Sequence, residues 1–134
     1  MRKNMFSTNV YSYINVLNKA ADASWLREET IVNNLANVNT PGYKRKDVDF
    51  QSVLKRELGS MKYQTLDSKV DHVDLSRLNV STYYDHANYS YRLDKNNVDV
   101  DTENVELASE KIRYDALTDS MTQEFSRLRT AMSK

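Results

Sequence analysis

The sequence predicts a mainly α protein in which long N- and C-terminal helices with heptad seams pair as a coiled coil, on either side of a small, irregular, β-rich middle insert. Apolar residues recur at steps of three and four near both ends of the chain, which is the spacing of a heptad seam. Between these segments the alternation becomes short and polar, as in half-buried strands. The only proline of the chain stands where the first pattern stops.

The 134 residues are enough for one domain of modest size. Residues 1–9 are rich in short polar side chains, so we expect a flexible N-terminus there. The pattern then predicts an N-terminal helix over 10–39, a turn and insert over 40–97, and a C-terminal helix over 98–134.

The N-terminal helix is expected to carry one apolar seam with two polar positions. Its members are Ile14, Leu17, Ala21, Ser24, Glu28, Ile31, Leu35 and Val38. Polar seam residues weaken an isolated helix pair but can set its register and its choice of partner. The spacing fits a helix packed on its own domain, and equally a helix that finds its partners in an assembly.

This helix is expected to end near residues 37–39. Pro41 has no N–H and disfavours the helical conformation at Thr40. Thr40 to Tyr43 fits a type II turn, with proline preset at its second position and Gly42 free to adopt positive φ at its third. Asn37 suits the exit because a short amide can bond backbone groups left open at a helix end. These residue types also fit an ordinary helix stop.

The insert is expected to combine short strands with one short helix. Residues 51–58 predict the helix, which Gly59 would end. The alternating runs that predict strands are 48–50, 61–63, 70–73, 78–80 and 89–91. Few of these residues are strongly apolar, so the insert is not expected to fold firmly alone.

The C-terminal helix is expected to start at a cap formed by Asp101 or Thr102, with Glu103 and Glu106 favoured by the helix dipole. Its seam positions are Leu107, Glu110, Tyr114, Leu117, Met121, Glu124, Leu128 and Ala131. Ile112, Phe125 and Met132 broaden this stripe. The residues expected at the helix-packing interface are Ile14, Leu17, Ile31, Leu35, Leu117, Met121, Phe125 and Leu128.

Composition argues against several functions. The formal charge is zero, so a nucleic acid is not an expected partner. No apolar run reaches the roughly 20 residues of a membrane span, and residues 1–30 lack the pattern of a cleaved signal peptide. Cysteine is absent, and the two histidines lack the ligand spacing of a zinc site. We therefore expect no metal, no cofactor and no catalytic residue.

One motif resembles that of a known family. Residues 36–43 read Ala-Asn-Val-Asn-Thr-Pro-Gly-Tyr and match the Ala-Asn-x-x-Thr-Pro-Gly-Tyr signature of bacterial flagellar rod and hook proteins. The resemblance continues over residues 44–50, 96–103 and 113–116, and is greatest to the short proximal rod proteins. It departs at Lys95, where the family often has glycine.

This resemblance implies a non-enzymatic structural subunit of the flagellar basal body rod. Its terminal helices would form the inner tube around the export channel, and the type III export apparatus would export it without cleavage. The implied partners are copies of the chain, other rod subunits, and the ring and export-gate components of the rod base. The turn residues expected to serve assembly are Asn37, Thr40, Pro41, Gly42 and Tyr43.

Two other classes of function remain open at this point. A cytoplasmic helical adaptor or export chaperone would also use heptad helices. A protein that binds or hydrolyses the cell wall would use Glu57, Asp71 and Asp74 together with the tyrosines of the insert.

Overall fold

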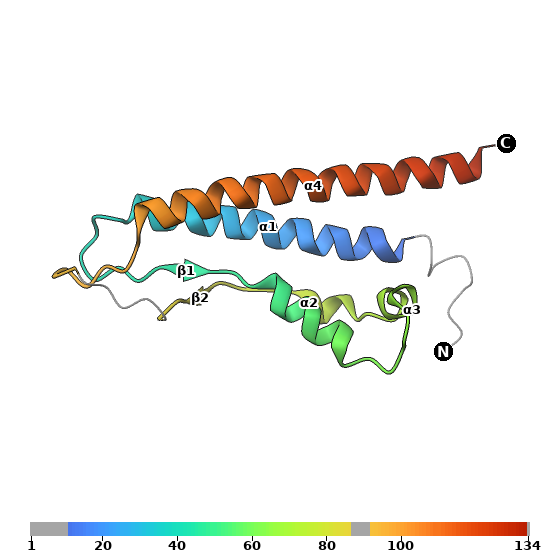
Figure 1. Cartoon of the computed structure of the whole chain (residues 1–134), viewed down its shortest axis with the longest axis horizontal. Helices are drawn as coiled ribbons and strands as arrows, with labels where there is room; N and C mark the ends of the chain where they lie inside the picture. Colours follow the sequence, from blue (N-terminus) through green and yellow to red (C-terminus); the bar gives the residue numbers. More distant parts are fainter. Residues whose placement is uncertain (1–10, 87–91, 134) are drawn as a thin grey trace.

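A computed structural model describes residues 11–86 and 92–133. Two long helices, α1 (Ser12–Ala36) and α4 (Val100–Met132), lie side by side and run in opposite directions (Figure 1). The mainly α-helical class with paired terminal helices is therefore confirmed. The flexible segment expected over residues 1–9 lies outside the described residues.

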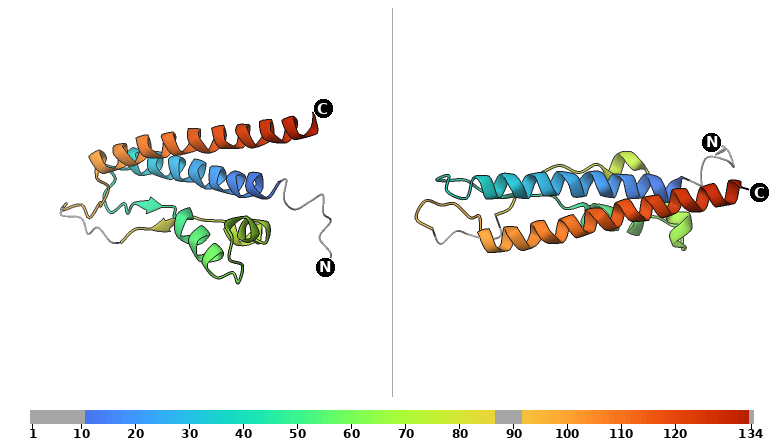
Figure 2. Two further views of the ribbon diagram at one scale, coloured as in Figure 1. Left: turned by 45° about the vertical axis from the view of Figure 1, so that its right-hand side comes forward. Right: turned by 90° about the horizontal axis from the view of Figure 1, so that it is seen from above.

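The two helices differ in length. α4 has 33 residues and α1 has 25, so α4 is about 50 Å long at the usual rise per residue. The C-terminal turns of α4 extend past the first turn of α1 (Figures 1 and 2). Ser24 and Glu110 face each other across the pair and set its antiparallel register.

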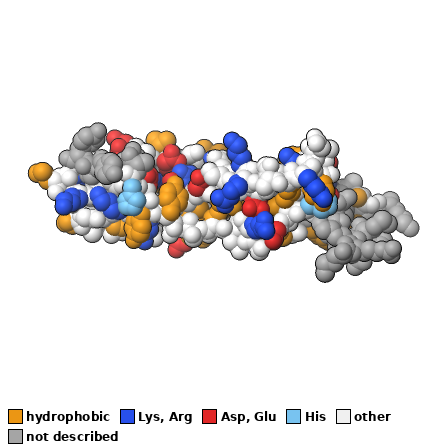
Figure 3. All heavy atoms as spheres, turned by 90° about the horizontal axis from the view of Figure 1, so that it is seen from below, with side chains coloured by type: hydrophobic (Ala, Val, Ile, Leu, Met, Phe, Trp, Pro, Cys, Tyr) orange, Lys and Arg blue, Asp and Glu red, His pale blue; other side chains and the backbone are white. Residues whose placement is uncertain are grey.

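The insert lies on the side of α1 opposite to α4, so α1 is the middle layer (Figure 1). β1 (Lys46–Asp47) pairs antiparallel with β2 (Tyr83–Tyr84), with Lys46 opposite Tyr84. The remaining elements of the insert are α2 (Phe50–Gly59), α3 (Leu66–Asp71) and the 3-10 helix η1 (Leu75–Leu78). On the face of Figure 3, side chains of both charges are interspersed with hydrophobic ones.

The strand positions predicted from alternation are wrong wherever the structure describes them. Residues 48–50 lead from β1 into α2, 61–63 form no strand, and Val70 and Leu78 lie in α3 and η1; residues 89–91 lie outside the described range. Thr65 and Asp74 cap the short helices by accepting from the Ser68 and Ser76 backbone N–H groups. A run of three alternating residues fits one helical turn as well as a strand. The capping side chains therefore determine that these segments are helical. The helix predicted over 51–58 is α2.

The start of α4 also differs from the expectation. Its N-cap is Asp99, whose carboxylate accepts from the N–H groups of Asp101 and Thr102. Glu103 lies in the first turn of α4, as expected, and its side chain is buried between α4 and the insert. The first turn of α4 is therefore part of the core.

The core is small and mixed in character. α1 buries Ile14, Ala21, Ala23 and Ile31, and the insert buries Val48, Val70 and Leu78. The buried residues of α4 are two carboxylates, Glu103 and Glu110. The helix pair is thus joined by half-buried apolar side chains and by charged groups that need counter-charges.

Candidate assembly site

The turn, residues 37–43, has the predicted conformation. α1 ends at Ala36, and the N–H of Tyr43 donates to the Thr40 carbonyl at 3.2 Å. Gly42 has φ +73°, as the third residue of a type II turn requires. Asn39 to Gly42 are exposed, so the tip of the turn faces solvent.

The segment before α4 holds this turn in place. The Gly42 N–H donates to the Asp94 carbonyl at 2.6 Å, and Arg92 Nη1 donates to the Val38 carbonyl at 2.8 Å. Lys95 has φ +64°, a conformation that glycine adopts without steric cost. A glycine at this position would adopt the same backbone conformation without the steric cost that the lysine side chain brings.

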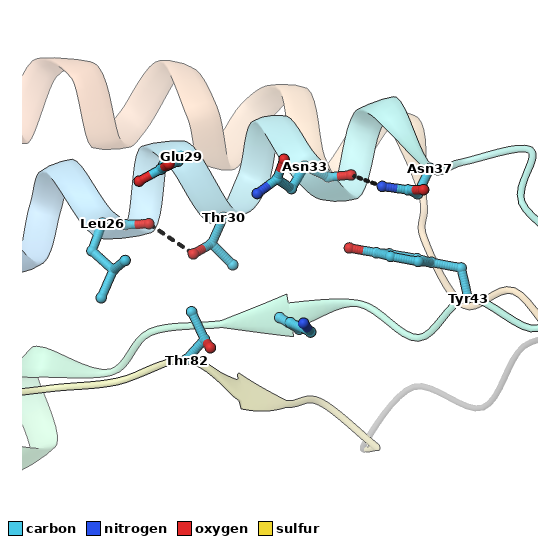
Figure 4. Close-up of a pocket in the computed structure, with 8 residues that line it drawn as sticks. Leu26, Glu29, Thr30, Asn33, Asn37, Tyr43 and Thr82 are labelled. Atoms are coloured by element: carbon cyan, nitrogen blue, oxygen red, sulfur yellow. Dashed lines mark hydrogen bonds between the residues drawn. The ribbon is translucent and has the colours of Figure 1, made fainter.

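Tyr43 connects the turn to α1 and β1. Its hydroxyl donates to Asn34 Oδ1 at 3.0 Å, and its ring lies below the end of α1 (Figure 4). The Asn34 side chain also donates to the Lys46 carbonyl at 2.8 Å and accepts from the Lys46 N–H at 3.0 Å. Burial and the nearby charge of Glu103 raise the pKa of Tyr43, so its hydroxyl stays a donor at neutral pH.

Two arginines join the helices and the insert in one ionic cluster, whose members are Arg27, Arg45, Asp47, Asp85, Glu103, Glu106 and Glu110. Arg27 contacts three carboxylates: Asp47 and Glu106 at 2.8 Å and Glu110 at 2.7 Å. Ser24 donates to the other oxygen of Glu110 at 2.7 Å. Two of the polar seam residues, Ser24 and Glu110, therefore bond each other across the helix pair.

Arg45 forms the second centre of the ionic cluster. Its Nε donates to Glu103 at 2.6 Å, and its two terminal nitrogens bond Asp85 and Asp47. The Arg45 residue is 7% exposed and Glu103 is 1% exposed. Since Asp47 also contacts Arg27, it links the two centres and couples the strands to both helices.

The pKa of Asp47 lies below its ordinary value of 3.8. Burial opposes the ionised form, but the hydrogen bonds from Arg27 and the Val48 N–H and the charge of Arg45 outweigh it. The stabilisation from ionised Asp47 is therefore present above pH 3.8 and is lost as the pH falls through the lowered folded value.

We expect Asp47→Asn to flatten the dependence of the unfolding free energy on pH as the pH falls below 3.8. The reason is that the variant has no carboxylate to protonate at this position. Urea unfolding of both proteins at half-unit pH steps measures the two slopes. Equal slopes in the variant and the unsubstituted chain would show that Asp47 does not carry this dependence.

The expected interface residues lie along the helix pair, with one exception. Ile14 and Ile31 are buried, and the half-buried members are Leu17, Leu35, Leu117, Met121 and Leu128. Phe125 instead points outward and is 50% exposed. Contact with a neighbouring molecule stays a prediction for all of them.

Several large apolar side chains face outward from the helix pair. Trp25 is 60% exposed and meets Tyr114 on α4 with ring centroids 5.9 Å apart. Val32, Val105, Ile112 and Met132 are also exposed. Exposed apolar side chains of this size are available for contact with a partner.

The remaining candidate chemistry is local. A cavity of about 370 Å³ between α1 and the strands is lined mainly by polar side chains (Figure 4). Ser12 donates to Asp71, Asp74 caps η1, and His72 stacks on Tyr63.

Within residues 11–86 and 92–133, no acidic or histidine side chains group as metal ligands. No helix in that part of the chain has the length and apolar character needed to cross a membrane.

Sequence reasoning missed Asn96, the two arginine centres and the bonds of Asn34 to Lys46. The sequence did carry an indication of the arginine centres. Glu103, Glu106 and Glu110 follow one another at steps of three and four on α4, so they would share a face and need basic side chains on the element packed against it. Arg27 is the only arginine of α1. The partner of Glu103 lies 58 residues away and leaves no local pattern.

Comparisons with known proteins agree with this architecture. Residues 14–44 match the family model described as flagella basal body rod protein. The flagellar basal body rod protein FlgB of Bacillus subtilis (strain 168) is 35% identical over 130 residues, which are 96% of each chain. FlgB of Escherichia coli (strain K12) is 34% identical over 66% of this chain and 69% of its own length. The chain belongs to the flagellar basal body rod protein family.

Proposed function

We propose that this chain is a subunit of the proximal rod and that its terminal helices assemble with neighbouring subunits into a tubular drive shaft. The shaft transmits torque and surrounds a channel for exported proteins. The observation that carries this proposal is the outward apolar surface of the α1–α4 pair, including Trp25, Ile112 and Phe125. A helix pair that has already buried one face needs a partner for the other.

Family membership establishes the broader part of this function. The chain is a structural component of the flagellar basal body rod and assembles with other rod components. It is not an enzyme, as the sequence predicted, because this is a family of structural proteins. The adaptor and the cell-wall enzyme considered from the sequence are therefore set aside.

The proposal also concerns the partners of this chain and the symmetry of the assembly that they form. We propose that the contacts between copies join unlike surfaces, with α1 of one copy against α4 of the next. Unlike surfaces that do not close into a ring generate a helical array, which is the symmetry a tube requires. The proposed partners are copies of the chain, other rod subunits, and the ring and export-gate components at the rod base. The proposed route to them is type III export without cleavage.

Leu117→Asp is expected to abolish rod assembly. Leu117 is half-buried on the seam of α4 and lines a groove of about 410 Å³ between α4, α1 and α2. A carboxylate placed there must be desolvated, and the arginines that line the same groove, Arg27 and Arg113, already contact Glu110. Swimming in soft agar and isolation of basal bodies measure the effect, with Leu117→Met as the matched control. Normal motility of the aspartate variant would contradict the proposed role of the seam.

The position along the rod can be tested directly. In cells that lack this gene, electron cryotomography should show the membrane ring and export gate with no rod above them. A rod of normal length in those cells would refute the proximal assignment, whereas a truncated rod would move this chain to a more distal position.

A further inference from the structure

Asn96 lies just before α4 and is 0% exposed. The two N–H groups of its Nδ2 are shared among three backbone carbonyls: Asn37 at 2.8 Å, Thr40 at 2.9 Å and Val38 at 3.0 Å. Its Oδ1 accepts from the Val98 N–H at 2.8 Å. One side chain therefore bonds both the exit of α1 and the approach to α4.

The carbonyls that Asn96 bonds each accept a second hydrogen bond. Asn37 and Thr40 accept from the N–H groups of Thr40 and Tyr43, and Val38 accepts from Arg92 Nη1. A carbonyl oxygen has two lone pairs, so the Asn96 amide supplies the other donor to these oxygens. Aspartate has the size of asparagine but no donor, and serine has one donor on a shorter side chain. Asparagine is thus suited to this position by its donors and by its length.

The outer side of the turn contrasts with this inner side. Asn39 to Gly42 are exposed, and a Cβ added at Gly42 would meet nothing within 4 Å. The side chains at the tip therefore add little to the packing of their own chain, although the backbone beneath them is held by Asn96, Asp94 and Arg92. A held backbone with a free outer surface is preorganised for a partner, because less conformational entropy is lost on contact.

We propose that Asn96 is a positioning residue for rod assembly, which fixes the turn against the start of α4 so that a neighbouring rod subunit meets a preformed surface at residues 39–42. This inference rests on the proposed function, because it assigns the turn to a contact in the rod. Asn96 itself is buried and acts through the turn.

Two measurements on Asn96→Ala test the inference. Hydrogen exchange of the purified chain should accelerate roughly tenfold for amides of residues 38–44 and 94–98, while the middle of α1 and α4 stays within about twofold. In cells the variant should be exported but should not restore rods to a strain lacking the gene. Asn96→Ser, which keeps one donor, should be intermediate in both measurements.

Asn79→Ala is the matched control, because Asn79 is an exposed asparagine that follows η1 and accepts from Lys19 Nζ at 2.6 Å, far from the turn. This variant should leave hydrogen exchange in the turn unchanged, and it should still restore rods in cells. Normal rods with Asn96→Ala would overturn the proposal, and so would faster exchange over the whole chain, which indicates general destabilisation. If the unsubstituted gene fails to restore rods, the proposed function is wrong. Faster hydrogen exchange of Asn96→Ala that is confined to the amides of the turn would still show that Asn96 holds the turn.

Discussion

Replacement of Arg45 by methionine is expected to lower the free energy of unfolding by about 3–5 kcal/mol, the range for breaking one side of a buried ion pair. The variant leaves Glu103, which is 1% exposed, without its counter-charge, and it also removes the bonds to Asp85 and Asp47. Urea unfolding at pH 7, followed by circular dichroism, measures the change.

Arg77→Met is the control for this prediction. The Arg77 side chain is 67% exposed and lies 3.7 Å from Asp74 and 3.9 Å from Glu57. Exposed pairs of this kind contribute at most about 1 kcal/mol. Adding Glu103→Met to Arg45→Met should recover part of the loss, because the second substitution removes the stranded charge. A loss below about 1 kcal/mol for Arg45→Met alone would show that Glu103 is not held by this pair.

Ile31→Ala is the second substitution with a large expected effect. Ile31 is a seam residue of α1, the middle layer, and is 0% exposed. Removal of its side chain loses apolar burial and leaves a cavity, at a cost of about 2–5 kcal/mol in unfolding free energy. Thermal and urea unfolding measure this loss, which should also reduce swimming at the upper end of the growth temperature range.

Val32→Ala provides a neighbouring control on the same helix turn. Val32 is half exposed, so its truncation should change the unfolding free energy by roughly 0.5 kcal/mol or less. Equal effects at positions 31 and 32 would mean that α1 does not bury the face assigned to its seam.

The parts of this fold that follow from local chemistry were predictable. Pro41 and Gly42 specify the end of α1 and the type II turn through their own backbone preferences. Ile14 and Ile31 are buried because heptad spacing places them on one face of a helix. The α-helical class, the turn and the helix pair therefore follow from patterns only a few residues long.

The parts that depend on distant partners were not predictable in this way. Glu103 fits a solvent-exposed residue near a helix N-terminus equally well, and only its contact with Arg45 shows that it belongs to the core. Asn34 and Asn96 are common residue types at helix ends, and their roles appear only when 12 to 59 residues of intervening chain bring their partners close. Val70 and Leu78 were misassigned because capping, rather than alternation, decides the structure of such short segments.

The side chain of Asn34 has a consequence for aggregation. It bonds the N–H and the carbonyl of Lys46 on the side of β1 that faces away from β2, and so occupies the place of a third strand. Unpaired strand edges recruit strands from other molecules and can start amyloid-like growth. At Lys46 this edge of the sheet is closed to a further strand, so in the described two-stranded sheet a strand from another molecule would add beside β2.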